Sequence, residues 1–504
     1  MLQTLKNAWK TKDLRSKILF TIFILLVYRI GTVIPVPFVD AHSFSAGLDG
    51  TILQQIDVFS GGAFGTATLF ALGVTPYINA SIIIQLLTVV FPKLGDIAKN
   101  DKEKMNVITK VTTLILALVT AIGYYFMLRN AGALTANALN SNITWLYAIV
   151  IIACFCAGAA IVMWLGDRIN ERGIGNGISM ILFANIIAQL PTFFYSLVAK
   201  VIIPTFGIEA DNELLYIIGS IVFALVVTAI LIGPFIFVIF VTGSERRIPI
   251  QYAKRVVGRK MYGGQSSNLP IKLNMTGVMP VIFASSIVGL LPTILSFCGI
   301  NESSEGFWGG VCRFFSASGV VYPILFFILI VAFSYFYTQI SFDPVEVSNN
   351  IKRQGGTIPG IRQGRPTAMY IKKILGKVTL AGALFLSIVA ILPIVLGPHV
   401  FTPIIERILT ASNQELINEW QAMQDPSSIY YQIYGEANIG QLANQMFTGS
   451  ADTTPMDAIS SQASSLASVF TFGGTSILII VGVVLETFRE LEAQLTMRNY
   501  KGFL

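Results

Sequence analysis

Residues 50–92 read GTILQQIDVFSGGAFGTATLFALGVTPYINASIIIQLLTVVFP, a partly polar, glycine-rich segment joined directly to a long apolar run. The first part carries Gln54, Gln55 and Asp57 and breaks at Gly73 before the apolar run begins. Polar groups and non-helical backbone occur at membrane depth only inside protein or beside a water-filled cavity. We therefore interpret residues 50–73 either as a re-entrant half-helix beside such a cavity or as an outer-surface loop, and these residues alone favour neither.

The apolar run that closes this stretch is one of ten, and a helix needs about 20 apolar residues to cross a bilayer. The chain is 54% hydrophobic and only 12% charged, whereas soluble domains carry about 25% charged residues. The runs are continuous, without the alternation of a β-barrel. They predict an all-α polytopic membrane protein with spans at about 18–37, 74–92, 111–128, 145–167, 177–198, 215–242, 274–296, 319–341, 378–397 and 469–488.

The order of these runs suggests a duplication. Five runs at 18–198 are followed by a connecting outer segment, 199–214, which we interpret as a hinge loop, and then by five more at 215–488. A unit of five helices crosses the membrane an odd number of times, so a second copy has inverted topology. We therefore expect two inverted halves.

Basic residues are distributed unevenly along the chain. With the N-terminus inside, the cytoplasmic segments hold 29 of the 34 Lys and Arg residues, so both the segment 1–17 and the tail 489–504 are predicted to be cytoplasmic. The loops 243–273 and 342–377 are basic and longer than short connections need. Topology with attraction to anionic lipid explains them, and so does a docking surface for an acidic or RNA-rich partner.

Residues 398–467 form a polar, acidic insertion on the outer side, which we expect to be a small helical cap or a mobile loop. Cys298 and Cys312 fall in the outer loop between the seventh and eighth runs, where a disulfide and two free thiols are both open alternatives. Only two His residues occur, and no CxxC or Cys/His cluster suggests a metal site.

No catalytic pattern is present, so we expect neither an enzyme nor a bound cofactor. The glycine-rich segments Gly61–Gly65 and Gly173–Gly177 lack the GxxxxGK[ST] pattern of a nucleotide site. Paired carboxylates, a His cluster and a nucleophile constellation are also missing from the sequence.

Seven short motifs occur in order along the chain, and together they closely resemble the SecY family, the channel subunits of the bacterial protein translocase. The resemblance covers the chain up to 396 and from 469 to the end. The motifs are FSGGA at 59–63, TPYI at 75–78 with SIIIQLL at 81–87, ERGIGNGIS at 171–179, RRI at 246–248, YAKR at 252–255, PGIR at 359–362 and FGGTS at 472–476.

The resemblance implies ten helices in two inverted halves around an hourglass pore with a lateral opening to lipid. The family's plug corresponds to residues 54–72, including Phe59, Ser60, Gly61, Gly62 and Ala63. A ring of branched apolar side chains resists ion leak by dewetting a narrow constriction, and it makes no specific polar demand on a passing chain. The ring positions implied by the resemblance are Val74, Ile78, Ile178, Leu182, Ile282 and Ile479.

Two amides and a set of basic residues complete the implied sites. Gln85 and Asn274 match a polar pair at the lateral gate, where one interhelical hydrogen bond is worth roughly 1 kcal/mol. Gln363 departs from the family, which commonly has Pro there. Arg362, Arg259 and Lys260 match positions used for the SecA motor and the ribosome, and we add four more basic residues of loop 243–273 to this docking surface: Arg246, Arg247, Lys254 and Arg255.

The sequence therefore predicts a protein-conducting channel that passes unfolded secretory polypeptides and releases membrane segments sideways. The implied partners are SecE, SecG, SecA, the ribosome, signal peptides, nascent polypeptides and lipids, but not DNA, and the implied location is the bacterial plasma membrane. The alternative is a secondary transporter of a small solute. Transporters usually place ionisable residues at the membrane centre, and the runs here are almost free of them.

Overall fold

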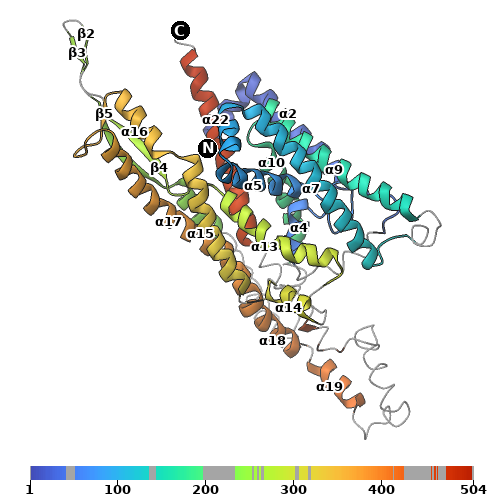
Figure 1. Ribbon diagram of the computed structural model, residues 1–504. Helices are drawn as coiled ribbons and strands as arrows, with labels where there is room; N and C mark the ends of the chain where they lie inside the picture. The colour runs from blue at the N-terminus through green and yellow to red at the C-terminus, as the bar shows by residue number, and fades with distance from the viewer. Residues whose placement is uncertain are drawn as a thin grey trace.

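The computed structural model describes residues 2–40, 52–135, 144–196, 233–252, 255–257, 260–262, 266–300, 306–315, 319, 321–412, 414–424, 454, 456, 459–460, 463 and 473–501. The described part is mostly helical (Figure 1). Several predictions lie outside the described residues: the hinge loop 199–214, the run 215–242 up to residue 232, Lys254, Arg259, and most of the insertion beyond residue 424.

Helices of the first half follow the predicted apolar runs. α2 begins at Lys12, ahead of the run 18–37, and ends at Gly31. It ends early because Ile34 precedes Pro35 and is biased toward extended backbone. The helices of this half are α1 (Leu2–Lys10), α2 (Lys12–Gly31), α4 (Ile52–Ser60), α5 (Thr75–Val90), α6 (Pro92–Asn100), α7 (Lys102–Asn130), α9 (Thr144–Arg172) and α10 (Gly177–Ser196).

Two helices of the second half, α17 and α22, extend well beyond their apolar runs. The segment 342–377, predicted as a loop, contains α16, a short strand and the start of α17, while the tail 489–504 continues α22 as far as Lys501. The described elements are a helix at Gly233–Gly243, α13 (Met279–Phe297), α14 (Phe307–Phe314), α15 (Val321–Ser341), α16 (Pro344–Arg353), α17 (Arg365–Leu396), the π-helix η2 (Gly397–Phe401), α18 (Thr402–Ser412), α19 (Gln414–Gln424) and α22 (Gly473–Lys501).

Five stretches of the described chain are long and apolar enough to cross a membrane. They are α7, α9, α13, α15 with its continuation to Arg353, and the stretch from Arg365 to Arg407. The count becomes six if α5 and α6, which meet at a bend of 117°, form one broken span. The chain is thus a multi-span helical membrane protein, and the number ten stays a prediction.

Two small sheets stand at one end of the helical body, an addition that hydropathy did not indicate (Figure 1). β1 (Glu245–Tyr252) pairs antiparallel with β4 (Ser266–Lys272) on one edge and with β5 (Gly356–Thr357) on the other. β2 (Arg255–Val257) and β3 (Lys260–Tyr262) extend the hairpin. Loop 243–273 is therefore a β-hairpin, and β5 joins it to the segment 342–377.

Period-two burial explains why β1 forms. Ile248 and Ile250 are buried, while Arg247, Pro249 and Gln251 between and beside them are exposed. The two isoleucines pack on a cluster that includes Ile371 and Leu375 of α17. One face of the hairpin is thus fixed on a long helix of the second half, which holds the exposed face in a defined place.

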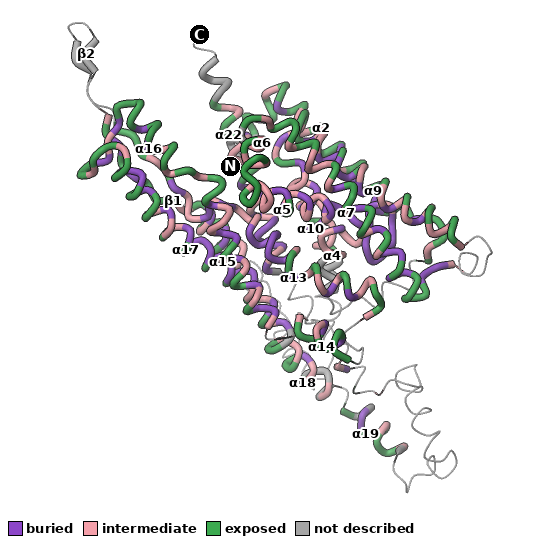
Figure 2. The backbone as a smooth tube through the Cα atoms, in the orientation of Figure 1, coloured by how far each residue is buried: buried purple, intermediate pink, exposed green. Residues whose placement is uncertain are grey.

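Three large apolar clusters fill the middle of the described helical body, and a smaller one joins α1, α2 and α22. One lies among α7, α9 and the segment before α5, a second among α13, α15, α17 and α22, and a third where α2, α9, α10, α13 and α22 meet. In Figure 2, buried segments run through the middle of the helical body, with exposed ones along its outer rim. Many large apolar side chains are exposed on α2, α7 and α9, which suits a lipid-facing surface.

Candidate functional site

The six side chains assigned to the pore ring all belong to the third, central cluster. Four are buried and two, Ile78 and Ile178, are half-buried. The cluster therefore joins helices of the first predicted half to helices of the second. The six come from α5 or the residue before it, α10, α13 and α22: Val74, Ile78, Ile178, Leu182, Ile282 and Ile479.

The predicted plug contains a short helix rather than a span. α4 has nine residues, about 14 Å at 1.5 Å per residue, and is too short for a hydrocarbon core of about 30 Å. Ser60, Ala63 and Phe64 at its end are buried. Burial of this turn favours the re-entrant interpretation over an outer-surface loop.

Two glycines let the chain leave α4 and turn back. Gly61 and Gly62 have φ of 73° and 87°, a left-handed region that glycine enters without steric cost. Gly61 also lies close against side chains of α2 and α10, because a Cβ placed there would be 2.7 Å from Arg29 Nη1 and 2.8 Å from Asn185 Oδ1. The glycine pair quoted from the sequence is therefore a requirement of the turn.

Hydrogen bonds within the plug hold this turn together. The Gly65 amide donates to Asp57 Oδ1 at 2.7 Å. Ser60 Oγ donates to the Asp57 carbonyl at 2.9 Å and accepts from the Phe64 amide at 2.9 Å. Asp57, read from the sequence as a polar interruption, thus serves as the internal cap of the turn.

Side chains from neighbouring helices also donate to plug carbonyls, and sequence reasoning missed them. Asn185 Nδ2 of α10 donates to Phe59 O at 2.7 Å, and Gln189 Nε2 donates to Asp57 O at 3.2 Å. Arg29 Nη1 of α2 lies 3.5 Å from Gly61 O, and the Tyr124 hydroxyl of α7 donates to Phe64 O. The sequence did offer one indication of these bonds, because Asn185 and Gln189 are amides within an apolar run and a buried amide in a membrane usually has a hydrogen-bond partner.

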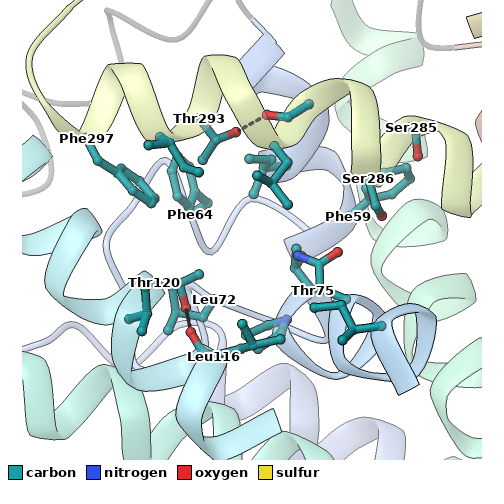
Figure 3. A pocket seen from close by; sticks show the side chains of 18 residues that line it. Phe59, Phe64, Leu72, Thr75, Leu116, Thr120, Ser285, Ser286, Thr293 and Phe297 are labelled. Atoms are coloured by element: carbon teal, nitrogen blue, oxygen red, sulfur yellow. Dashed lines mark hydrogen bonds between the residues drawn. The ribbon is translucent and has the colours of Figure 1, made fainter. Parts of the chain in front are cut away.

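A cavity of about 280 Å³ lies beside the plug, between α4, α5, α7 and α13. Figure 3 shows Phe59 and Phe64 of the plug pointing into it together with Phe297 of α13. Its few polar groups include Thr120 and Thr293, whose hydroxyls donate hydrogen bonds to carbonyls of their own helices. The cavity is therefore an apolar space between one helix of each predicted half, α5 and α13.

The two predicted gate amides are not bonded to each other in the described structure. Gln85 Nε2 donates to Ser81 Oγ at 3.2 Å, and its Oε1 is buried without a partner. Asn274 Oδ1 accepts from Thr276 Oγ1 at 3.5 Å. The assignment of Gln85 and Asn274 as a pair stays a prediction.

The predicted docking residues lie on the lobe formed by the two sheets, α16 and the start of α17. Arg246 and Arg247 are exposed on β1, where Arg247 Nε pairs with Glu245 Oε1 at 2.7 Å. Arg255 and Lys260 stand on the paired strands β2 and β3. Lys254 and Arg259 lie outside the described residues.

The turn before α17 brings Arg362 to the same lobe. Arg362 is exposed between Gly360 and Gly364, which both have positive φ. Gln363, the departure from the family pattern, donates from Nε2 to Gly356 O at 3.0 Å. This bond ties the turn to β5 and supplies a constraint where Pro is absent.

The C-terminal helix α22 contacts the first half and the helix Gly233–Gly243, which leads into this lobe. Arg489 Nη2 donates to Thr242 O at 3.3 Å, and Glu490 Oε2 accepts from the Gly175 amide at 2.9 Å. Burial lowers the pKa of the Lys272 amine on β4, and the Arg489 guanidinium lowers it further. The helix thus contacts both predicted halves at the end of the helical body that carries the sheets.

All four cysteines are free thiols in the structure. Cys298 is exposed, and Cys312 is buried on α14 with its Sγ 3.6 Å from Ile300 O. Of the two alternatives for Cys298 and Cys312, the structure holds the unbonded one.

Comparisons with known proteins identify relatives over the whole chain. A family model described as SecY matches residues 68–411. The "Protein translocase subunit SecY" of Streptomyces coelicolor is 36% identical over 517 residues, covering all of both chains. The protein of that name from Mycobacterium bovis is 36% identical over 520 residues, again with full coverage. A solved structure titled "The structure of a protein conducting channel" matches 82% of this chain and 94% of its own, at 20% identity and a TM-score of 0.51.

Proposed function

The chain belongs to the SecY family, and from that membership we infer that it is the protein-conducting subunit of a protein translocase. It is a multi-span membrane protein, for which we propose the bacterial plasma membrane and cytoplasmic termini. The observation that carries the channel assignment is the central cluster, in which six branched apolar side chains from four helices or their ends converge beside the short plug helix and its buried turn.

Such a cluster suits passage of polypeptides better than binding of a solute. Branched apolar side chains dewet a constriction and oppose ion leak. They make no hydrogen bonds, so a chain of any sequence replaces one set of apolar contacts by another. The plug residues 54–72 supply the second barrier, and the turn at Gly61 and Gly62 supports that role by returning the chain toward α5.

A lateral exit toward lipid is supported by the cavity between α5 and α13. Its walls are largely apolar, and it borders Phe59 and Phe64 of the plug. An apolar segment entering there gains roughly 25 cal/mol for each Å² withdrawn from water. We propose that signal peptides and membrane segments use this space and that Gln85 and Asn274 line the gate.

The exposed basic lobe supports docking of cytoplasmic partners. Arg246, Arg247 and Arg362 present guanidinium groups, which bind carboxylate or phosphate in a planar, bidentate way. We propose SecA and the ribosome as the partners of this lobe, with SecE and SecG as membrane subunits. Energy then comes from such partners or from the membrane potential, and the chain itself carries no catalysis.

The secondary-transporter alternative needs an ionisable side chain available to substrate at membrane depth. Asp57 lies two residues before Phe59, which packs against the central cluster, and its carboxylate accepts from the Gly65 amide within the plug. Arg29 is likewise directed at Gly61 O. Both charges support the plug turn, which favours the channel.

The test of the channel is a double substitution of ring residues. Ile78→Gly with Ile282→Gly opens the constriction, so resting ion conductance of the purified complex in planar bilayers is expected to rise. Ile115→Gly with Ile328→Gly is the matched control, because both isoleucines are lipid-exposed on α7 and α15. A resting conductance equal to wild type in the ring variant would remove these residues from the pore.

A further inference from the structure

The carbonyls at the end of the plug helix are bonded by side chains from outside the plug. The last four carbonyls of a helix have no partner within it. Here the plug's own turn serves two of them, since Asp57 O accepts from the Gly62 amide at 2.9 Å and from Ser60 Oγ, and Val58 O accepts from the Gly61 amide at 3.1 Å. Gln189 Nε2 donates a hydrogen bond to Asp57 O at 3.2 Å, and Asn185 Nδ2 donates one to Phe59 O at 2.7 Å. The Arg29 guanidinium lies 3.5 Å from Gly61 O. These three donors lie on α10 and α2, and a cation at this end also suits the helix dipole.

Asn185 is the best-placed of the three. It is fully buried, and its Nδ2 also donates to the Tyr28 hydroxyl at 2.8 Å. Tyr28 is itself fully buried and stacked on Phe70, with ring centroids 5.5 Å apart. Both amide hydrogens of Asn185 are therefore used, and its orientation is fixed from behind.

The free oxygen of Asn185 supports this orientation. Oδ1 is buried without a hydrogen-bond partner and faces Gly61. Exchanging the oxygen and nitrogen would direct Oδ1 at Phe59 O, placing two acceptors 2.7 Å apart. The amide is thus held as a donor to the plug, even at the cost of an unsatisfied oxygen.

We propose that Asn185, supported by Gln189 and Arg29, is a latch that holds the plug closed by its backbone carbonyls. This rests on the proposed channel function and adds the residues that set how readily the plug leaves. Because the acceptors are backbone groups, the latch is indifferent to the plug's side chains. Because its donors stand on α2 and α10, parting of α5 from α13 leaves these bonds intact, so the latch sets plug release separately from lateral opening.

The test measures plug opening and sealing independently in the purified complex. Asn185→Leu removes the donor at similar volume, and Asn185→Asp replaces it by an acceptor. Hydrogen exchange of backbone amides in residues 57–65 reports plug opening, and resting ion conductance reports the seal. Loss of a buried donor is expected to speed exchange there roughly 5- to 30-fold, and conductance rises with it.

Asn130→Leu and Asn130→Asp are the matched controls, because Asn130 is an exposed amide at the end of α7. Exchange that stays at the wild-type rate overturns the latch, whatever the conductance does. Faster exchange with unchanged conductance upholds the latch and overturns the plug as a seal. If the Asn185 variants fail to fold, Gln189→Leu decides, since this half-buried donor predicts the same change at smaller size.

Discussion

Gly61→Ala tests how closely the plug turn fits its wall. A residue with a Cβ at φ of 73° costs about 1–2 kcal/mol in this conformation. The new Cβ would also lie 2.8 Å from Asn185 Oδ1, an atom that does not move freely because its amide is held by Phe59 and Tyr28. Weakening those bonds adds about 1 kcal/mol, so the closed plug loses about 2–3 kcal/mol in total.

Two other glycines separate backbone strain from contact. Gly62 has φ of 87°, but a Cβ placed there would be 3.9 Å from its nearest neighbour, Gln189 Nε2. Gly132 has φ of 69° and nothing within 4 Å of such a Cβ, and it lies after α7, outside the plug. Gly62→Ala therefore reports strain in the plug alone, and Gly132→Ala reports the same strain elsewhere.

Resting conductance in planar bilayers is the assay for all three variants. We expect Gly61→Ala to leak most, Gly62→Ala less, and Gly132→Ala as little as wild type. A loss of about 2–3 kcal/mol corresponds to a roughly 30- to 150-fold rise in the open fraction of the plug. A Gly61→Ala channel as tight as wild type, or one no leakier than Gly132→Ala, refutes the close approach.

Two further predictions concern the ends of the molecule. Arg362→Glu is expected to slow SecA-driven translocation into reconstituted vesicles about tenfold, because a charge-assisted hydrogen bond is lost and a repulsion is gained. The control is Arg313→Glu, a charge reversal at an exposed residue of α14. Equal translocation rates for the two variants would exclude Arg362 from docking. We propose that residues 400–465 form a cap on the outer funnel that meets emerging substrate or an external chaperone. Deletion of these residues is expected to slow export and to remove the outer cross-links to substrate. Normal export with normal cross-links would exclude that role.

Hydropathy predicted the helices that lie within apolar runs, but it did not predict where those helices end beyond the runs. α7 and α9 cover their predicted runs, because about 20 apolar residues suffice to specify a span. α17 and α22 run past their apolar runs into water, since polar residues such as Lys372 and Glu490 continue a helix as well as apolar ones. The end of an apolar run marks the edge of the membrane, not the end of the helix.

The β-hairpin was missed for a different reason. A window as long as a membrane span averages over the alternation of Ile248 and Ile250 with exposed neighbours. At the plug, the sequence indicated a glycine-rich segment but not the turn at Gly61 and Gly62. The role of Asn185 depends on Tyr28 and Phe59, which are 157 and 126 residues away in sequence. No local pattern encodes contacts of that range.

The strength of the latch suits a channel that must open for an apolar segment. The three bonds of the latch, at about 1 kcal/mol each, hold plug carbonyls in addition to the bond from the Tyr124 hydroxyl to Phe64 O. Burying one large aliphatic side chain returns about 1.5–3 kcal/mol, and the cavity beside Phe59 and Phe64 is apolar. One or two apolar side chains that replace Phe59 and Phe64 in that cavity therefore offset the latch, because their burial requires the plug to leave. A hydrated ion gains nothing there and does not. On the proposed function, the same balance keeps the resting channel sealed and lets a signal peptide open it.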